Sequence, residues 1–334
     1  MRQVVLIAGG VGGAKFARGL CAALGDDQAG LTVVVNTGDD MWLTGVRVCP
    51  DLDSMMYALA GVNDAQRGWG RAGESERVSA ELKAYGVGWP WFTLGDLDLG
   101  THLARTSLLR GGLPLSEVTA RLCARWEAFS AGPRLLPATD AEVETWVETD
   151  EGAMHFEEWW VRTRASAAAR RFVQRGVEHA GPAAGVVEAI SAADLVILAP
   201  SNPVVSLGTI LGFADAAGGP GVPGIPGVRE AVQQTLAPVV GVSPIIGGAP
   251  VRGMAAQCLD ALGHACTAES VGRSYRARSR GGLLDTWLVD TEDAAAVPQL
   301  ESAGLNARAV PLWMHNDDAS RRLAEETLVG APAR

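Results

Sequence analysis

The 334-residue chain lacks several features that would each indicate a different class of protein. Its five cysteines are scattered and form no C-x-x-C pair, so we expect neither a disulfide framework nor a zinc site, and we expect a reducing, cytoplasmic setting. No apolar run approaches the ~20 residues of a membrane span, and the first residues lead into a predicted strand rather than a cleavable leader, so no membrane partner is expected. The net charge is -10, and without a basic surplus a nucleic-acid partner is not expected either.

Lysine is also scarce, because only Lys15 and Lys83 are lysines among 28 basic residues. We interpret the bias toward arginine, together with the abundant alanine and glycine, as the mark of a high-GC genome rather than of function. A lysine that persists in such a chain carries more weight as a functional candidate. Lys15 is that candidate, because it lies in the first glycine-rich motif.

The stretch around which the chain is organised is VVLIAGGVGGAKFARGL, residues 4–20. An apolar run ends at four glycines within five positions, and Phe16, Leu20 and Leu24 then recur at the spacing of one helical face. A glycine turn between a buried strand and a helix presents backbone N–H groups at the positive end of the helix dipole. The stretch therefore predicts a phosphate-binding loop. A turn that needs glycine only for its dihedral angles is the alternative.

This loop matches neither common phosphate motif. Phe16 follows Lys15 where a Walker loop needs serine or threonine, and Lys15 stands where a dinucleotide fingerprint needs its third small residue. The next predicted strand ends at Asn36, an amide, where an NAD site would place an acidic side chain. Asp39 and Asp40 come three residues later, and two carboxylates beside a phosphate loop indicate a Mg²⁺ site. A solvated turn would explain the same pair.

A second acidic pair, Asp51 and Asp53, lies at the predicted start of a helix after Pro50. Capping a helix needs only one carboxylate. If the first two strands are neighbours, both acidic pairs lie at one mouth, where four carboxylates repel each other unless a cation or substrate protons neutralise them. We therefore predict a catalytic or metal-binding role for at least one of Asp51 and Asp53, with helix capping as the alternative.

A tryptophan- and glycine-rich segment, RGWGRAGESERVSAELKAYGVGWPWFTLGDLDLGTH, begins at Arg67. Its rings, Trp89 and Trp91 among them, are interleaved with glycine and proline, so no regular amphipathic helix spans the whole segment. Rings on loops form a satellite cluster in the core, or they present flat faces to a conjugated heterocycle. Asp96 and His102 follow closely, and these polar side chains favour the second interpretation.

The rest of the chain alternates predicted strands and helices. Strands are expected at 194–199, 238–242, 284–289 and 307–310, and helices at 253–262 and 317–328. Between them, 108–129 is expected to be helical with a break, 134–150 a strand or hairpin, and 155–176 a surface helix or helix pair. We predict an α/β, Rossmann-like, open and mostly parallel sheet with helices on both faces. We predict a single domain, 1–334. Its core comprises about residues 1–61 and 182–334, and a mostly helical cap is inserted at about 62–181.

Three loops rich in glycine, serine, asparagine and proline follow predicted strands: residues 9–13, 200–203 and 243–250. In an open parallel sheet, ligands bind outside the carboxyl ends of the strands. The three loops and the acidic pairs are therefore expected to surround one nucleotide pocket.

Seven blocks in order resemble the CofD family, and more closely its FbiA branch: AGGVGGAKFARGL, VVNTGDDMW, CPDLDSMMYALAG, TLGDLDLGTH, MHFEEWWV, APSNPVVSLGTIL and VSPIIGGAPVRGMA. The resemblance implies a Mg²⁺-dependent phospho-group transferase of coenzyme F-420 biosynthesis, commonly a homodimer. Such an enzyme passes a phosphoenolpyruvyl or phospholactyl group from a guanosine diphosphate-linked donor to the ribityl hydroxyl of the deazaflavin Fo. GMP leaves, and the product is dehydro-F-420-0 or F-420-0.

The motifs and the resemblance together assign roles to the candidate residues. The catalytic candidates are Asp51 and Asp53, and the metal candidates are Asp39 and Asp40. The nucleotide- and phosphate-binding candidates are Gly9, Gly10, Gly12, Gly13, Lys15, Ser201, Asn202, Pro203, Ser243, Ile246, Gly247 and Gly248. The candidates for binding Fo are Trp42, Asp51, Asp53, Thr93, Asp96 and His102. Some relatives are expected to carry basic residues where this chain has Thr93 and Leu97, so a cationic grip on the acceptor from this loop is not assigned.

Two other functions stay open at this level. A non-catalytic sugar-nucleotide-binding regulator would share the fold and the glycine loop, but the Asp-x-Asp pair and the tryptophan-rich segment favour the enzyme. An NAD-dependent dehydrogenase is disfavoured by Lys15 and Asn36. The sequence leaves open which donor is used, which aspartate binds the metal, and where the oligomer interface lies.

Overall fold

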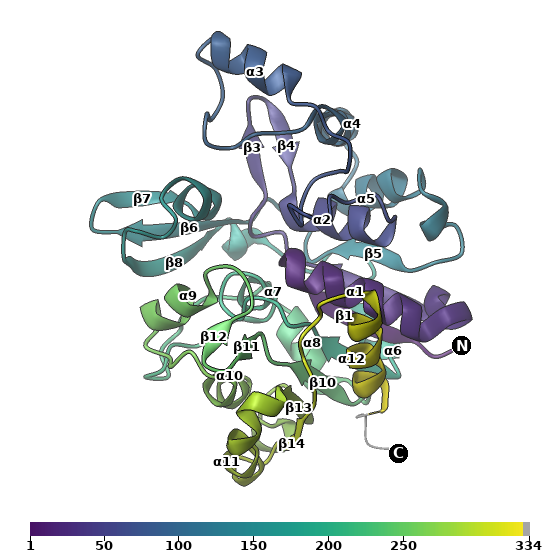
Figure 1. Cartoon of the computed structure of the whole chain (residues 1–334), viewed down its shortest axis with the longest axis vertical. Helices are drawn as coiled ribbons and strands as arrows, with labels where there is room; N and C mark the ends of the chain where they lie inside the picture. The colour runs from purple at the N-terminus through teal and green to yellow at the C-terminus, as the bar shows by residue number, and fades with distance from the viewer. Residues whose placement is uncertain (330–334) are drawn as a thin grey trace.

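The computed structural model describes residues 1–329 and has at its centre a sheet of seven strands in the order β14-β13-β10-β9-β1-β2-β5 (Figure 1). Every neighbouring pair in this sheet is parallel. The strands are β1 (Val4–Ala8), β2 (Leu31–Val35), β5 (Arg134–Pro137), β9 (Leu195–Leu198), β10 (Val239–Val242), β13 (Thr286–Val289) and β14 (Asn306–Ala309). The predicted open, parallel α/β sheet is confirmed.

The strand order reverses between β1 and β9. The chain runs outward from β1 through β2 to β5, returns to the other side of β1 at β9, and continues through β10 and β13 to β14. Because all seven strands point the same way, the loops after their carboxyl ends lie along one edge of the sheet. In doubly wound sheets, ligands bind at the point where the order reverses, which here is the loop after β1.

Helices cover both faces of the sheet, as predicted. Alternate residues of β1 face opposite layers: Val5 and Ile7 join one buried cluster, and Leu6 joins the other. The layer that includes Leu6 also contains side chains of α1 (Gly10–Leu24), α2 (Pro50–Leu59), α5 (Leu115–Cys123) and α12 (Asp317–Val329). The other layer contains side chains of α6 (Val186–Ala192), α7 (Leu207–Leu211), α8 (Val228–Gln234), α9 (Ala255–Ala261), α10 (Ala268–Tyr275) and α11 (Val297–Ser302).

Two groups of elements extend from this body (Figure 1). The hairpin of β3 (Met41–Leu43) and β4 (Val46–Val48) packs with α4 (Asp96–Arg110), and α3 (Arg77–Ala84) lies at the tip. An antiparallel sheet of β7 (Gly152–His155), β6 (Glu144–Thr149) and β8 (Ala169–Arg175) forms the second group. A further small hairpin of β11 (Ile245–Ile246) and β12 (Ala249–Pro250) follows β10.

The structure corrects the sequence prediction at two places. Residues 155–176 are not a helix pair: one π-helical turn (Glu158–Arg162) is followed by strand β8, whose Phe172 is buried. The helix expected from residue 108 begins at Asp96, because the carboxylate of Glu74 accepts hydrogen bonds from the first-turn amides of Leu97 and Asp98. We keep the core and the 62–181 insert as a proposed division, although β5 within that range pairs with β2 in the main sheet.

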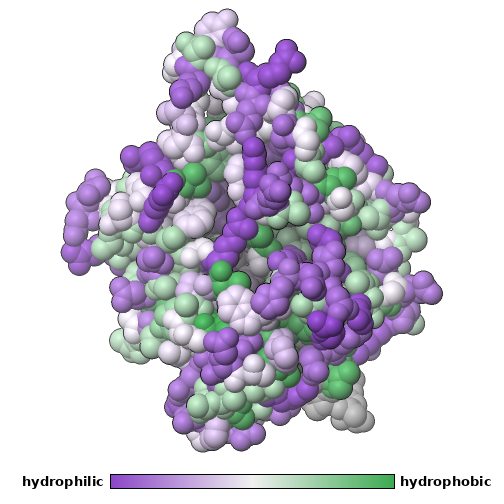
Figure 2. Space-filling view, in the orientation of Figure 1, coloured by the Kyte–Doolittle hydropathy of each residue, from purple (hydrophilic) through white to green (hydrophobic). Residues whose placement is uncertain are grey.

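The face of the molecule shown in Figure 2 is largely hydrophilic, with hydrophobic residues in small separate patches. Most of the large apolar side chains are instead buried in the two layers against the sheet. Among the described residues, no helix has both the length and the apolar character needed to cross a membrane.

Candidate functional site

The glycine loop joins β1 to α1 at the reversal point of the sheet. The amide of Gly9 donates to Ser201 Oγ (3.0 Å), and this hydroxyl donates back to the carbonyl oxygen of Gly9 (2.6 Å), so the loops after β1 and β9 are tied together. Gly10 has a φ of +67°, and a Cβ added at Gly13 would lie 2.7 Å from Ser201 Oγ. The close approach therefore requires glycine at position 13.

The N-terminus of α1 is available for an anion. No side-chain hydrogen bond caps α1 at Gly9, and its first turn carries no acidic residue. Lys15, in the second turn of α1, is exposed. The first amides of this 15-residue helix, of which that of Gly10 faces Asp51, lie at the positive end of its dipole with a lysine beside them, an arrangement that suits phosphate groups.

Two carboxylates in the first turn of α2 face different partners. Asp51 accepts a hydrogen bond from Asn36 Nδ2 (3.0 Å), at the tip of β2, and a second from the amide of Gly10. Asp53 instead contacts Arg105 through a charge-assisted hydrogen bond and lies 3.5 Å from His102 Nδ1. Asp51 thus lies against the glycine loop, and Asp53 lies at the interface with α4.

The acidic pair after β2 is divided in the same way. Asp40 lies beside Arg47, with 3.8 Å between Oδ2 and Nη2, and Arg47 also pairs with Glu144 (3.1 Å). Asp39 accepts a hydrogen bond from the Asn36 side chain, so one amide connects Asp39 and Asp51. Burial raises the pKa of Asp40 to about 7, although Arg47 acts against this shift.

Glu157, which follows β7, is a third carboxylate without an ion-pair partner among the described residues, besides Asp39 and Asp51. It is 8% exposed, and its charge acts on both Asp39 and Asp51. Burial raises the pKa of Glu157 to about 8 and that of Asp51 to about 6, and burial with the nearby carboxylates raises the pKa of Asp39 well above its ordinary value. Among the described residues, no basic side chain forms an ion pair with these three carboxylates.

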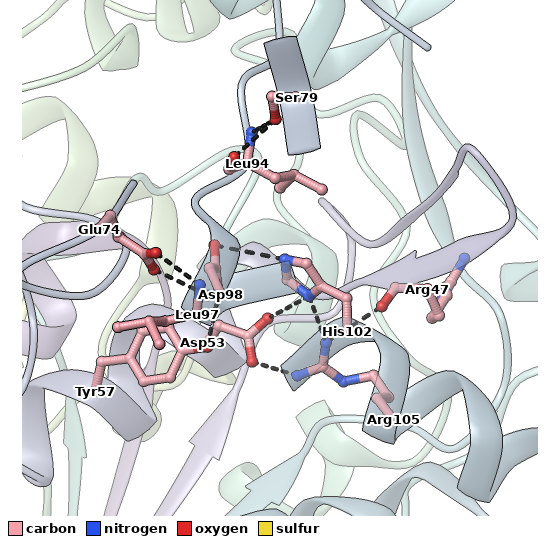
Figure 3. A network of polar contacts seen from close by, with 10 residues as sticks. All are labelled: Arg47, Asp53, Tyr57, Glu74, Ser79, Leu94, Leu97, Asp98, His102 and Arg105. Atoms are coloured by element: carbon pink, nitrogen blue, oxygen red, sulfur yellow. Dashed lines mark hydrogen bonds and ion pairs between the residues drawn. The ribbon is translucent and has the colours of Figure 1, made fainter. Parts of the chain in front are cut away.

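The second polar group, on α2 and α4, is a network of ion pairs and hydrogen bonds (Figure 3), in which Asp53 Oδ2, His102 Nε2 and Arg105 Nε have no hydrogen-bond partner among the described residues. His102 Nε2 lies 3.4 Å from Asp98 Oδ2, and the hydroxyl of Tyr57 donates to Asp98 Oδ1 (2.7 Å). Arg105 bridges Asp53, the ring of His102 (3.1 Å to Nδ1) and the carbonyl oxygen of Arg47 (3.2 Å). Charged groups in this buried network each have a partner of opposite sign, which is the arrangement that low-dielectric surroundings require.

The two polar groups differ in how well they suit a divalent cation. Ligand atoms of Asp53, Asp98 and His102 lie within 4.8 Å of one another, but the guanidinium of Arg105 contacts this group and repels a cation. At the other group, Asp39 Oδ1 and both carboxylate oxygens of Asp40 are buried without a hydrogen-bond partner. Mg²⁺ prefers carboxylate oxygens, so Asp39 fits it better than the histidine group, whereas Asp40, like Asp53, lies beside an arginine.

The predicted acceptor residues are not all brought together. His102 lies in the buried network, and Trp42 is 37% exposed on β3, where its Nε1 donates to Glu142 (3.1 Å). Asp96 instead accepts hydrogen bonds from Ser75 Oγ (2.5 Å) and the amide of Val78 (3.1 Å) next to α3. The carboxylate of Asp96 therefore has a local structural role.

Nearby, Trp89 and Trp91 stack, with ring centroids 5.0 Å apart and planes 15° apart, and Thr93 follows this pair, partly buried. Stacked rings of this kind on a loop keep the flat-face interpretation open.

Many polar groups of the later predicted loops, 200–203 and 243–250, form hydrogen bonds with other groups of the protein. Asn202 Oδ1 accepts from the amide of Val204 (2.9 Å), and Ser243 Oγ donates to the carbonyl oxygen of Ile245 (2.9 Å). The amide of Gly247 donates to Asp293 (3.0 Å). Of the other residues predicted in these loops, Pro203 and Ile246 are buried and Gly248 is exposed in the β11–β12 turn. Ser201 is the member that reaches the glycine loop.

Sequence reasoning did not assign a role to Asn36, Arg47, Arg105 or Glu157. A signal for Arg105 was present, because it follows Asp98 and His102 at helical spacings of seven and three residues and so shares their face of α4. Glu157 lies in the MHFEEWWV block, but neither periodicity nor spacing relates it to Asp39 or Asp51. Only the packing of the β6–β8 sheet against the turn after β2 brings it there, as the hydrogen bond from Thr145 N to Gly38 O (2.6 Å) shows.

Comparisons with known proteins give a consistent result. Residues 4–321 match the model of the family described as "2-phospho-L-lactate transferase CofD". A protein of Streptomyces griseus named "Phosphoenolpyruvate transferase" is 51% identical over 330 residues, covering 98% of this chain and 97% of the relative. A protein of Streptomyces coelicolor with the same name is 50% identical, with the same coverage. A solved structure of a UPF0052-family protein from Bacillus halodurans has a TM-score of 0.58 at 18% identity and covers 98% of each chain, which supports the fold alone.

Proposed function

Because this chain belongs to the CofD family, we propose that it is an enzyme of coenzyme F-420 biosynthesis that transfers a phosphoenolpyruvyl or phospholactyl group. The proposed donor is phosphoenolpyruvate or 2-phospholactate linked to guanosine monophosphate through a diphosphate. The proposed acceptor is the ribityl hydroxyl of Fo. The bond from the transferred phosphorus to GMP breaks, a bond to the acceptor oxygen forms, and the hydroxyl loses its proton. The product is dehydro-F-420-0 or F-420-0, and the name of the relatives favours the enolpyruvyl donor.

One observation carries the proposal: the N-terminus of α1 adjoins buried carboxylates that have no cationic partner among the described residues, and one of them, Asp51, accepts from the Gly10 amide. A Cβ added at Gly9 would lie 2.5 Å from Asp51 Oδ2, so the carboxylate is in contact with the loop itself. Phosphoryl transfer depends on positioning and on neutralising phosphate charge rather than on a covalent intermediate. An anion site next to a cation site meets both needs.

The chain's own groups then have separate tasks in the proposed mechanism. The first amides of α1 and the ammonium group of Lys15 hold the diphosphate of the donor. Asp39, with Asp40 as the second predicted ligand, holds Mg²⁺, and the unpartnered oxygens of both residues support this role. The bound ion neutralises charge on the phosphate oxygens.

Asp51 is the better candidate of the two α2 aspartates for the acceptor hydroxyl. Its carboxylate adjoins the phosphate loop, so a hydroxyl that donates to it would face the transferred phosphorus and could lose its proton there. Asp53 instead pairs with Arg105 through Oδ1, and its Oδ2 lies 3.5 Å from His102 Nδ1, so the carboxylate faces the network with α4. We assign the catalytic role to Asp51 and a positioning role to Asp53.

The test is to incubate the protein with Fo, Mg²⁺ and each guanylylated donor in turn and to identify the product by mass spectrometry. We expect a product heavier than Fo by the transferred group, and GMP in equal amount. The two candidate products differ by two hydrogens, so the same experiment identifies the donor. No product from either donor would refute the proposal.

The regulator considered from the sequence makes a different prediction. It would bind a nucleotide but not Fo, whereas the enzyme binds both, and Fo binding is measured directly by its fluorescence. A homodimeric state and a cytoplasmic location stay predictions from the sequence.

A further inference from the structure

A cavity at the amino-terminal edge of the central sheet is lined by basic side chains. Its volume is about 230 Å³, and its lining residues are Arg273, Arg276, Ala277, Arg280, Ala303 and Leu305. Leu305 directly precedes β14, and Ala277 pairs with Leu284, shortly before β13. Because all strands of the sheet point the same way, the cavity lies at the opposite end of these strands from the loops of the candidate site.

The cavity concentrates positive charge in a chain whose net charge is -10. Three of its lining residues are arginines, and none of the lining residues is acidic. Arg273 pairs with Glu269 (3.0 Å), but Arg276 and Arg280 form no ion pair with any residue in 1–329. The protein therefore leaves the charges of these two arginines without a carboxylate partner.

Hydrogen bonds to the backbone fix both unpaired side chains. Arg276 Nη2 donates to the carbonyl oxygen of Arg280 (3.0 Å), and Arg280 Nη2 donates to the carbonyl oxygen of Ser302 (3.0 Å). A Cβ added at Gly304 would lie 3.0 Å from Arg280 Nε, so glycine at position 304 leaves room for this guanidinium. The other guanidinium nitrogens of the two arginines have no hydrogen-bond partner in the described part of the chain.

The dipole of α10 accounts for only part of this charge. Arg273 lies in the last turn of α10, where a cation stabilises a helix, but Arg280 lies beyond it in the 3-10 turn Arg278–Arg280. Arg276 follows the helix with a φ of +61°, in the region that favours glycine. An arginine at a position with this conformational cost indicates that its side chain has a role.

We propose that the cavity binds a small oxyanion, a phosphate or carboxylate group, between Arg276 and Arg280. The planar guanidinium group presents paired N–H donors that match the oxygens of either group. Buried Ala277 and Leu305 form an apolar part of the lining, which strengthens electrostatic attraction by excluding water. The cavity is smaller than the roughly 300–1,000 Å³ of pockets for drug-sized ligands, so the ligand assigned to it is a small anion.

The experiment measures the melting temperature of the full chain as inorganic phosphate or succinate is added at constant ionic strength. A specific site gives a response that saturates with the occupancy of the site, whereas general stabilisation by phosphate grows with its concentration. Every protein in the series carries Lys15→Gln, which weakens phosphate binding at the glycine loop. Tighter saturation by phosphate identifies a phosphoryl ligand, and tighter saturation by succinate identifies a carboxylate ligand.

Substitutions in the cavity should weaken the saturable response. Arg276→Gln and Arg280→Gln are each expected to lower the affinity about 10-fold or more, because each removes a charge-assisted hydrogen bond to the anion. Arg280→Lys keeps the charge but not the paired donors, so a smaller loss is expected. The matched control is Arg170→Gln, which removes an equal charge from an exposed pair with Asp150 (2.7 Å) and should leave the affinity unchanged.

Two outcomes would overturn the proposal. One is the absence of a saturable response to either anion in the Lys15→Gln protein. The other is an unchanged affinity in both Arg276→Gln and Arg280→Gln. If Arg276→Gln gives no cooperative melting curve, the two Arg280 variants decide, because Arg280 is exposed outside the helix. No donor or Fo is present, so the result is independent of the proposed transferase activity.

Discussion

Replacing Asp53 by asparagine tests whether this aspartate anchors the structure or performs chemistry. The side chain is 6% exposed and contacts Arg105, whose side chain is 2% exposed. Asparagine keeps the shape but leaves a guanidinium buried without its counter-charge. Removing one partner of a buried ion pair in this way costs about 3–5 kcal/mol.

The corresponding change in melting temperature follows from the size of the protein. An unfolding entropy of about 2.1 cal/mol/K per residue gives roughly 0.7 kcal/mol/K for 334 residues, so the loss corresponds to a decrease of about 4–7 °C. Differential scanning calorimetry of the unmodified protein and of Asp53→Asn measures it. The matched control is Asp150→Asn, which breaks a fully exposed pair with Arg170 (2.7 Å) and should leave the melting temperature nearly unchanged.

A double variant makes the test stricter. Asp53→Leu combined with Arg105→Met removes both charges and replaces them with apolar side chains, which at buried pairs is often neutral or stabilising. We therefore expect the double variant to melt higher than Asp53→Asn. The reasoning is refuted if Asp53→Asn has the melting temperature of the unmodified protein but loses turnover. The ion pair would then contribute nothing to stability, and Asp53 would again be the catalytic candidate.

Three further predictions concern the phosphate loop and the unpaired carboxylates. Asp51→Asn should lower turnover of Fo by about two to four orders of magnitude and leave GDP affinity largely unchanged, measured by product formation and by calorimetry, and full turnover in this variant would remove the catalytic assignment. In chelator, the protein should melt at a lower temperature near pH 8.5 than near pH 6. The reason is that the raised pKa values of Asp51 (about 6) and Glu157 (about 8) make the native state bind more protons than the unfolded chain, an advantage lost as pH rises through this window. Added Mg²⁺ near pH 8.5 should reverse the loss, and a melting temperature independent of pH would contradict the expectation. Gly13→Ala should destabilise the protein by about 1–3 kcal/mol and weaken GDP binding, because the new Cβ would lie 2.7 Å from Ser201 Oγ and displace the hydroxyl from its two hydrogen bonds. Gly100→Ala, in an open position of α4, should stabilise by about 0.5–1 kcal/mol, and equal effects of the two substitutions would refute the packing argument.

The central sheet was predictable because its signals are local. The strand at Val4–Ala8 is an apolar run that ends in glycines, and apolar runs that end in loops with serine and proline identified β9 and β10. The prediction of a surface helix after His155 was wrong. The charges and small residues of this segment suit such a helix, but the strand that contains Phe172 is fixed by its pairing with β6. Strand pairing between distant segments leaves no periodic mark in the strand itself.

For the candidate site, the sequence predicted which segments come together but not how their side chains are directed. Gly10 and Asp51 were expected together because the glycine loop and both acidic pairs were placed at one mouth if the first two strands are neighbours, and the structure places the Gly10 amide beside the Asp51 carboxylate. What could not be predicted was the direction of each carboxylate. Asp51 and Asp53 are two residues apart in a helix, so they project about 200° apart and meet different partners. Sequence alone grouped them as one pair of equivalent acids.

Because Asp51 and Asp53 project in different directions, the first turn of α2 contacts both the glycine loop and α4. The Asp53 side of α2 is locked to α4 by Arg105, and the same arginine donates to the carbonyl oxygen of Arg47, the residue that neutralises Asp40. Through Arg105, α4 is therefore connected both to α2 and to β4, which follows the acidic loop. The Asp51 side is left without counter-charge, which disfavours the empty site and favours a cation bound with a phosphate. The neutralised carboxylates thus hold the geometry, and the unneutralised ones are available for the ligand.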